Sequence, residues 1–266
     1  MDCQEELQDS LQIIWRQKKK KNNYYIEETM KNTYKFGDIP VEIEYRGTYF
    51  EKKAKDYITD EKPLFSIFAT DEDLVYEQEH AEDGAVYSKP YIEYVAIYRL
   101  FCEKAIDYGV VLLHSSVVEV DGECYLFAAK SGTGKSTHTR MWREVFNDRA
   151  VMINDDKPLI KEEDGKFYAY GTPWDGKHGL SVNRRSPIKA ICYIEQGEKN
   201  EIKKADVTDI THKLIAQVYR PRNQEGVIKT LDFADSMLKS IPMYEMKCTI
   251  SHEAAEMAYD MMKDGE

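Results

Sequence analysis

The sequence lacks the features of a membrane or secreted protein. No apolar run approaches the roughly 20 residues that a membrane-spanning helix needs, and the first residues are acidic and polar, so we expect neither a membrane segment nor a signal peptide. No C-x-x-C spacing occurs, which favours buried or free thiols in a reducing cytoplasm over a zinc site or a disulfide framework. The cysteines are Cys3, Cys102, Cys124, Cys192 and Cys248.

Positive charge is also scarce. The 266 residues contain 37 lysines and arginines against 48 aspartates and glutamates, a formal net charge of -11. An acidic chain is a poor non-specific binder of nucleic acid or of an anionic membrane, so we expect neither as a partner. Hydrophobic residues make up 42% and charged residues 32%, which is ordinary for a globular chain with one large domain or a core domain and an accessory lobe.

The N-terminal third predicts a small β-rich lobe. Apolar and polar residues alternate in residues 41–45, which places the apolar side chains on one face of a strand. Residues 64–69 and 74–76 are two further expected strands. We therefore divide the chain into an accessory lobe of residues 1–88 and a nucleotide-binding domain of residues 89–266.

Residues 1–22 leave two alternatives open. They are polar and carry a basic cluster, Lys18 to Lys21, which is typical of a solvated terminus. Ile13, Ile14 and Trp15 also permit a short amphipathic helix that would dock on a partner.

The second part predicts an α/β fold with a mixed, hairpin-rich sheet flanked by helices. A helix is expected over residues 91–108, and strands over 110–120 and 124–128. The Asp121-Gly122 dipeptide between the two strands is a strong hairpin signal. Further strands are expected at 159–161, 167–170, 188–195 and 243–250, and further helices at 208–219, 224–241 and 253–262.

The stretch around which this domain is organised is Ala129-Lys-Ser-Gly-Thr-Gly-Lys-Ser136, between a strand and a helix expected over residues 137–146. Backbone N–H groups in such a loop bind phosphate, a lysine at position 135 reaches the β- and γ-phosphates, and the next hydroxyl contacts Mg²⁺. Ala129 replaces the usual first glycine, which requires a negative φ there. We expect ATP to contact Lys130, Ser131, Gly132, Thr133, Gly134, Lys135, Ser136 and Thr137.

Two aspartates, Asp155 and Asp156, end the apolar strand that follows the loop helix. A carboxylate at the end of a strand is where nucleotide enzymes hold Mg²⁺ beside the γ-phosphate. Adjacent residues of a strand point to opposite faces, so one aspartate can face the metal while the other accepts a proton from a hydroxyl. A turn-forming aspartate pair is the alternative. The expected metal ligands are Ser136, Asp155 and Asp156.

His114, residues 131–136, the aspartate pair and Gly171-Thr-Pro-Trp-Asp-Gly-Lys177 together resemble the kinase core of bacterial HPr kinase/phosphorylase and ATP-dependent phosphoenolpyruvate carboxykinase. The resemblance covers roughly residues 110–195. It implies a P-loop kinase core that uses ATP and Mg²⁺, with His114 near the metal or the transferred phosphoryl group and Asp156 as proton acceptor or metal contact. The chain is too short for a carboxykinase and is closer to small kinase-like proteins of that superfamily, some of which act on serine in modified peptides.

Basic residues that could neutralise charge in the transition state are Lys177, Arg184 and Arg185. Adjacent arginines point oppositely in an extended chain, so we expect at most one to serve, and a solvated pair is the alternative. The expected catalytic residues are Asp156, Asp155, His114, Lys135 and Arg185.

These observations predict an ATP-dependent kinase in the cytoplasm. It would transfer the γ-phosphoryl group to a hydroxyl group, that of serine above all, on a peptide, a protein or a small metabolite, and it could be an oligomer. A nucleotide-sensing module without turnover is one alternative. Phosphorylase chemistry, or another phosphoryl donor on the same fold, is a second, since no motif for recognition of the base can be located.

Overall fold

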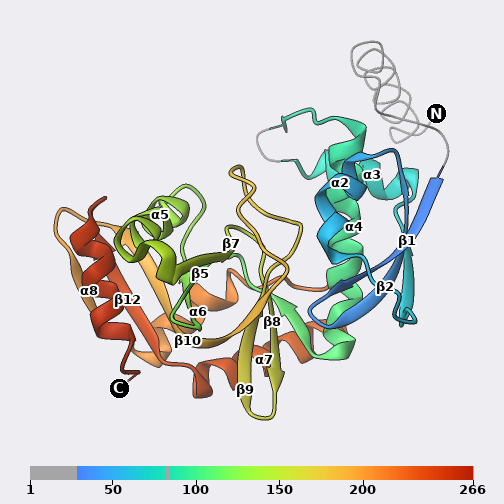
Figure 1. Ribbon diagram of the computed structural model, residues 1–266. Coiled ribbons are helices and arrows are strands. Elements are labelled where there is room, and N and C mark those ends of the chain that lie inside the picture. Colours follow the sequence, from blue (N-terminus) through green and yellow to red (C-terminus); the bar gives the residue numbers. More distant parts are fainter. Residues whose placement is uncertain (1–28, 82–83, 266) are drawn as a thin grey trace. The chain divides into compact units, whose positions relative to one another are not determined.

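The structure is a computed structural model that describes residues 29–81 and 84–265. The chain divides into two compact units, the first ending at Phe101 and the second beginning at Cys102. The dividing point lies within helix α4 (Lys89–Ala105) (Figure 1). The boundary that the sequence suggests at residue 88 stays a prediction.

The first unit contains a three-stranded sheet. Strands β1 (Thr29–Phe36) and β2 (Ile39–Arg46) form an antiparallel hairpin, and the two turn residues, Gly37-Asp38, have positive φ angles. Strand β3 (Phe65–Phe68) lies parallel to β2. Strands β2 and β3 confirm two of the three strands predicted here, while β1 was not predicted. The helix considered for residues 1–22 lies outside the described residues.

The third predicted strand, at residues 74–76, is wrong, because these residues lie within helix α3 (Asp71–Glu79). The Thr70 hydroxyl accepts a hydrogen bond from the backbone of Asp73, and the Asp73 carboxylate accepts one from the backbone of Thr70. This capping box starts a helix, and it outweighs a three-residue apolar run. With α2 (Tyr49–Ala54) and most of α4, the first unit is mixed rather than β-rich.

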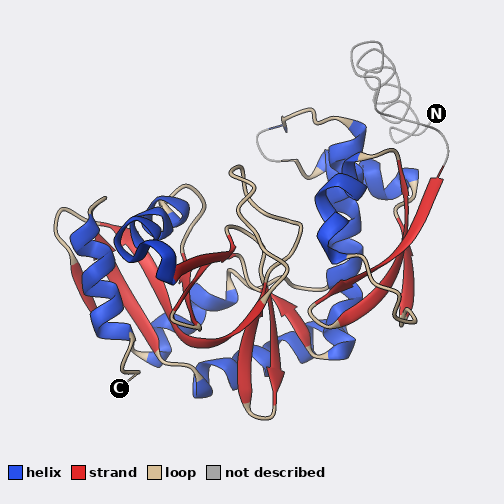
Figure 2. Cartoon of the chain, in the orientation of Figure 1, coloured by secondary structure: helices blue, strands red, loops and turns tan. Residues whose placement is uncertain are grey.

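A curled, mixed sheet forms the core of the second unit (Figure 2). Its strand order is β4-β8-β9-β10-β6-β5-β7, and β12 pairs with both β10 and β11. Strands β6, β10 and β12 run parallel to one another, while the other pairs are antiparallel. The strands are β4 (Val110–Leu112), β5 (Ser115–Val120), β6 (Glu123–Ala128), β7 (Ala150–Asn154), β8 (Leu159–Glu163), β9 (Lys166–Tyr170), β10 (Arg185–Gln196), β11 (Glu201–Lys204) and β12 (Met243–Cys248).

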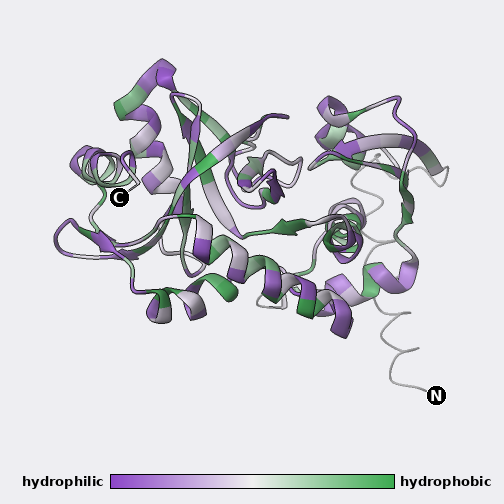
Figure 3. Cartoon of the chain, turned by 90° about the horizontal axis from the view of Figure 1, so that it is seen from below, coloured by the Kyte–Doolittle hydropathy of each residue, from purple (hydrophilic) through white to green (hydrophobic). Residues whose placement is uncertain are grey.

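Helices cover both faces of this sheet, α5 and α8 one face and α6 and α7 the other. Strand β6 serves both cores, since Leu126 packs on the side of α6 and α7 while Tyr125 and Phe127 pack on the other side. The helices carry both purple and green segments in Figure 3, as expected for elements with one buried face. The helices are α5 (Lys135–Phe146), α6 (Val207–Ile215), α7 (Gln224–Ser240) and α8 (His252–Met262).

The single strand predicted over residues 110–120 is wrong, because the structure has two strands there. Strand β4 pairs with β8, whereas β5 pairs with β6 and β7. At Leu113 and His114 the chain passes from pairing with β8 to pairing with β6 and β7. The backbone N–H of His114 donates to the carbonyl of Gln217 at 2.8 Å, and Leu113 forms an isolated bridge with Val218. This tertiary contact interrupts the strand, and no local sequence signal announces it.

The hairpin predicted at Asp121-Gly122 is confirmed, and it positions His114. Strands β5 and β6 are antiparallel with Ser115 opposite Ala128 at the open end. His114, which precedes Ser115, therefore lies at the same edge of the sheet as the loop that follows Ala128. Strand β7 pairs with the other side of β5 and ends at Asn154 near the same edge. Three segments with candidate site residues thus meet there.

The sequence predicts no membrane-spanning helix and no disulfide framework. Within residues 29–81 and 84–265, no helix combines the length and apolar character that crossing a membrane requires. The four cysteines of this part are free, with Cys248 half-buried and the other three buried. Cys3 lies outside the described residues.

Candidate functional site

The glycine-rich loop, residues 129–136, joins the end of β6 to the start of α5 as predicted. Gly132 and Gly134 have φ angles of 77° and 115°, which favour glycine even though a Cβ at Gly132 would meet no atom within 4 Å. Ala129 is buried and is not among the described residues with positive φ, so alanine fits there. The free N–H groups and the dipole of α5 favour an anion at this loop. The contacts with ATP expected of Lys130, Ser131, Thr133, Ser136 and Thr137 stay predictions.

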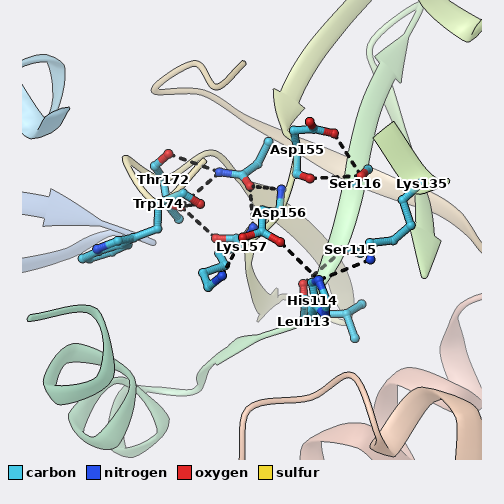
Figure 4. Close-up of polar contacts among 11 residues, drawn as sticks. Leu113, His114, Ser115, Ser116, Lys135, Asp155, Asp156, Lys157, Thr172 and Trp174 are labelled. Atoms are coloured by element: carbon cyan, nitrogen blue, oxygen red, sulfur yellow. Dashed lines mark hydrogen bonds and ion pairs between the residues drawn. The ribbon is translucent and has the colours of Figure 1, made fainter. Parts of the chain in front are cut away.

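Lys135 is the first residue of α5 and is 8% exposed. Its Nζ lies 3.2 Å from Nε2 of His114 (Figure 4). Burial lowers the pKa of Lys135, while the charges of Asp156 and Asp155 act in the opposite direction. A buried ammonium group at a helix N-terminus has lost most of its hydration, so an arriving phosphate would compensate it well.

The two aspartates lie in a turn directly after β7, and Asn154 shapes that turn. The fully buried Asn154 accepts hydrogen bonds at Oδ1 from the backbone N–H groups of Asp156 (2.8 Å) and Lys157 (2.6 Å). Its Nδ2 donates to the backbone carbonyl of Thr172 at 3.1 Å. An asparagine that accepts from the following backbone in this way forms a tight turn. The turn sends the two neighbouring carboxylates to different partners, as Figure 4 shows.

Asp155 points into the protein and is 3% exposed. The Ser116 hydroxyl lies 3.1 Å from both its Oδ1 and its backbone carbonyl oxygen. Burial raises the pKa of Asp155, and hydrogen bonds from the Ser116 and Ser136 hydroxyls oppose that rise. Asp155 Oδ2 is buried without a hydrogen-bond partner among the described residues. A buried carboxylate oxygen in this state lacks a compensating donor or cation.

The residues around Asp155 fit Mg²⁺. Mg²⁺ takes oxygen ligands and is usually held by one or two carboxylates together with phosphate and water. The unpartnered Oδ2 of Asp155 and the neighbouring Ser136 hydroxyl supply such oxygens. Within the described part of the chain, no group of three or more His, Cys, Asp or Glu side chains could hold a metal ion. Asp155 and Ser136 are therefore the residues of this site that could hold Mg²⁺.

Asp156 is held between the side chains of His114 and Lys157. Its Oδ1 lies 3.1 Å from Nε2 of His114, and its Oδ2 lies 2.5 Å from Nζ of Lys157. Burial acts to raise the pKa of Asp156, but the hydrogen bond from His114 and the charge of Lys157 outweigh it and hold the pKa well below its usual range. Asp156 is therefore a carboxylate at neutral pH. His114 lies between it and Lys135 of the glycine-rich loop.

Residues 171–179 form a loop against the aspartate pair. At Gly171 a Cβ would lie 1.8 Å from the carbonyl oxygen of Val182, so the close approach of these two backbones requires glycine. A Cβ at Gly176 would lie 3.5 Å from Asp155 Oδ2, which places this part of the loop beside the carboxylate. Trp174 is 2% exposed, so its ring packs inside the protein.

Arg185 does not join this group. Its guanidinium forms an ion pair with Glu163 and donates to the Tyr170 hydroxyl at 2.9 Å. Arg185 stands opposite Tyr170 at the start of β10, whereas Tyr193 of the same strand stands opposite Ala128, just before the glycine-rich loop. The eight residues from Arg185 to Tyr193 span about 26 Å along the strand.

The other two basic candidates are not held at the aspartates either. Arg184 pairs with the buried Glu119 at 2.8 Å. Lys177 is exposed in the loop of residues 171–179. The cations that the structure holds at the aspartate pair are instead Lys135 and Lys157.

Sequence reasoning missed three residues that build the site: Ser116, Asn154 and Lys157. Asn154 directly precedes the aspartate pair, and an asparagine at the end of a strand is a recognised turn signal. Lys157 directly follows the pair, where a cation beside two carboxylates could have been noticed. Ser116 had no comparable signal, because its role depends on the pairing of β5 with β7.

Comparisons with known proteins give a family match and weak likenesses to solved structures. A family model described as "SynChlorMet cassette protein ScmC" matches residues 91–258. Among solved structures, the HPr(Ser) kinase/phosphatase from Coxiella burnetii is 10% identical with a TM-score of 0.32, and the match covers 57% of this chain and 94% of that chain. No curated protein matches the chain.

Proposed function

The chain belongs to the ScmC family, and we propose that it is an ATP-dependent kinase that transfers the γ-phosphoryl group to a hydroxyl group. The acceptor would be a serine or another hydroxyl on a peptide, a protein or a small metabolite. One observation carries the proposal. A glycine-rich loop with a buried lysine, a histidine and two differently held carboxylates converge at one edge of the sheet.

In this proposal the loop and Lys135 bind the phosphates. The N-terminal N–H groups of α5 are oriented toward the loop, and Lys135 Nζ lies among His114 and the aspartates rather than in solvent. Such preorganised donors stabilise charge on a phosphoryl group without reorganising during the reaction. Mg²⁺, when bound through Asp155 and Ser136, would neutralise part of the phosphate charge.

Asp156 is the proton acceptor in this proposal. It is ionised at neutral pH, and His114 Nε2 fixes one of its oxygens at 3.1 Å. The hydroxyl oxygen of the acceptor would form its bond to the γ-phosphorus while the bond to the leaving oxygen of ADP breaks, and the hydroxyl proton would pass to Asp156. His114 positions this carboxylate and connects it to Lys135.

A nucleotide-binding module without turnover is the second candidate, and one observation favours it. A low pKa makes Asp156 a weak base, and both of its oxygens are already held, one by His114 and one by Lys157. In such a module the aspartates would hold Mg²⁺ and the loop would sense nucleotide, with no proton transfer required.

The experiment that tests the kinase proposal measures binding and turnover together. Lys135→Ala should lose most affinity for Mg·ATP in titration calorimetry, while a control, Lys166→Ala at the start of β9, should match wild type. ADP release would be followed with water and with serine-containing peptides as acceptors. A Lys135→Ala protein that binds and hydrolyses ATP as wild type does would refute the proposal. Thermal stabilisation by ATP without ADP release from any acceptor would favour the binding module.

A further inference from the structure

We propose that Lys157 is the second cation that contacts the transferred phosphoryl group, in the place that sequence reasoning gave to an arginine. This inference rests on the proposed kinase function and adds a catalytic residue to it. It follows from three observations: where the arginines lie, how Lys157 is held, and how charge is distributed around Asp156.

Arg184 and Arg185, the two arginines that the sequence suggested for the reaction, are engaged elsewhere. Phosphoryl transfer spreads negative charge over the equatorial oxygens, and enzymes commonly place a cation there in addition to the lysine of the loop. Arg184 is paired with the buried Glu119 at 2.8 Å, and Arg185 is paired with Glu163. Using Arg184 at the glycine-rich loop would take an ion-pair partner from the buried Glu119, and using Arg185 would take one of two cations from Glu163.

Lys157 combines a fixed backbone with a head group that can move. Its backbone N–H donates to Asn154 Oδ1 at 2.6 Å, and its carbonyl accepts from the Thr172 hydroxyl at 2.8 Å. Its side chain is 33% exposed, and its Nζ lies 2.5 Å from Asp156 Oδ2 (Figure 4). A lysine ammonium on a four-carbon stem can change partners without any change in the turn that carries it.

Two ammonium groups lie near Asp156. Lys157 Nζ is 2.5 Å from its Oδ2, Lys135 Nζ is 3.2 Å from the histidine that holds its other oxygen, and the two like charges repel each other. A phosphoryl group between them would relieve that repulsion. It also carries more negative charge than one carboxylate, so it would compete with Asp156 for Lys157.

The consequence for the reaction is a change of partner. When the γ-phosphoryl group is in place, Lys157 Nζ moves from Asp156 Oδ2 to a phosphoryl oxygen. Oδ2 is then available to the acceptor hydroxyl, whose oxygen bonds to phosphorus as the bond to ADP breaks and whose proton passes to Asp156. Charge stabilisation and release of the proton acceptor thus depend on the same side chain.

The experiment compares Mg·ADP alone with Mg·ADP plus aluminium fluoride, which imitates the group in transfer and needs no identified acceptor. Titration calorimetry would be run on wild type, Lys157→Met, Lys157→Arg and Lys161→Met. Lys161 is a matched control, since it is also ion-paired, at 2.8 Å to Glu163, but on the β8–β9 hairpin. Thermal melts serve as the folding control.

We expect Lys157→Met to bind Mg·ADP within about twofold of wild type but to lose about 100-fold of the affinity gained from aluminium fluoride, the usual cost of removing one donor to a developing charge. Lys157→Arg should recover part of that gain, and Lys161→Met should match wild type.

Two results would overturn the role of Lys157 alone. The first is a Lys157→Met protein that keeps the full gain from aluminium fluoride. The second is an equal loss for Mg·ADP with and without aluminium fluoride, which would make Lys157 a partner of Asp156 and nothing more. A wild-type protein that binds no Mg·ADP would instead overturn the kinase proposal itself.

Discussion

The β8–β9 hairpin and the edge of the sheet at the glycine-rich loop both gather lysine, arginine or histidine around carboxylates, but they pair them differently. At the hairpin, Glu163 receives Lys161 at 2.8 Å, the Arg185 guanidinium, and the Tyr170 hydroxyl at 3.0 Å. The hydrogen bond from Lys161, with help from Tyr170 and Arg185, lowers the pKa of Glu163 to about 2. Each of these charges has a partner of opposite sign.

At the edge of the sheet the pairing is incomplete. Asp155 Oδ2 is buried without a hydrogen-bond partner among the described residues, although the charges of both aspartates act on Lys135. Ion pairs near the surface contribute little to stability, and their charges need no further partner. A buried carboxylate oxygen without a donor or a cation is unfavourable unless a ligand completes its pairing. Incomplete pairing, rather than the density of charge, therefore marks the candidate site.

The largest expected effect comes from Asp156→Asn. The change keeps shape and volume but removes the proton acceptor, so turnover should fall by about 10²- to 10⁴-fold while nucleotide still binds. Asp155→Asn should act mainly through the Mg²⁺ dependence, and His114→Ala should weaken turnover with the fold retained. The measurement is ADP release at saturating Mg·ATP with thermal melts as control. Full activity in Asp156→Asn would remove this residue from the mechanism, and equal, complete losses in both aspartate variants would leave a coupled pair without separate roles.

A buried titratable group without a charged partner shows the effect of burial on a pKa apart from the effect of ion pairing. His138, inside α5, accepts a hydrogen bond from Trp142 Nε1 at 3.1 Å, and burial lowers its pKa from 6.5 to about 4. The unfolded chain therefore binds a proton between about pH 6.5 and pH 4 that the folded protein excludes. The free energy of unfolding should fall as the pH drops through this window, by about 3 kcal/mol in all.

The test of this dependence is His138→Gln, which keeps an acceptor for Trp142 without a titrating group. Urea unfolding at pH 7 and pH 4.5 should show a smaller loss of stability for the variant than for wild type. The same pH dependence in both proteins would show that His138 titrates in the folded state as it does in the unfolded chain.

A smaller effect is expected from Asn154→Leu. It leaves the backbone N–H groups of Asp156 and Lys157 without their acceptor in a buried turn, which should lower the free energy of unfolding by about 1–3 kcal/mol. The control is Asn200→Leu, since half-buried Asn200 accepts from the backbone of Thr249 at 2.9 Å, where water can replace it. Urea unfolding compares the two variants. Equal costs would mean that the turn is not the sensitive point.

The smallest effect is expected from Arg185→Met at the hairpin. Its guanidinium is half-exposed and paired with Glu163, so its removal should change the free energy of unfolding by about 0–1 kcal/mol and leave turnover unchanged. The same assays of ADP release and unfolding apply. A tenfold loss of turnover with unchanged stability would return Arg185 to the reaction and blur the distinction between the two clusters.

The sequence predicts well where the signal is local. The helix expected over residues 91–108 is α4 followed by a single 3₁₀ turn, and it stops at Gly109, whose φ is 70°. The glycine-rich loop and the Asp121-Gly122 turn lie where predicted, because glycine readily supplies positive φ angles and aspartate, here Asp121, also adopts one. His114, found by resemblance, lies beside Lys135 and Asp156.

Prediction from the sequence fails where the local structure depends on contacts with segments that are distant along the chain. The strand expected over residues 110–120 breaks because Gln217 takes the N–H of His114. Arg185 looked as available as any basic residue near the aspartates, yet the pairing of β9 with β10 holds it against Tyr170. Ser116 contacts Asp155 through the pairing of β5 with β7, which no spacing in the sequence announces. These are properties of sheet order, which one sequence does not reveal.

The length of the β5–β6 hairpin sets the distance between its turn and the site. Both strands span six residues from the turn, so Asp121-Gly122 lies about 20 Å from the edge where His114 and the glycine-rich loop meet. Because the two strands have equal lengths, His114 and the glycine-rich loop reach the same edge of the sheet. A change of register by one residue would turn the side chains of a whole strand to the opposite face. The geometry around Lys135 therefore depends on a turn at the far end of the hairpin.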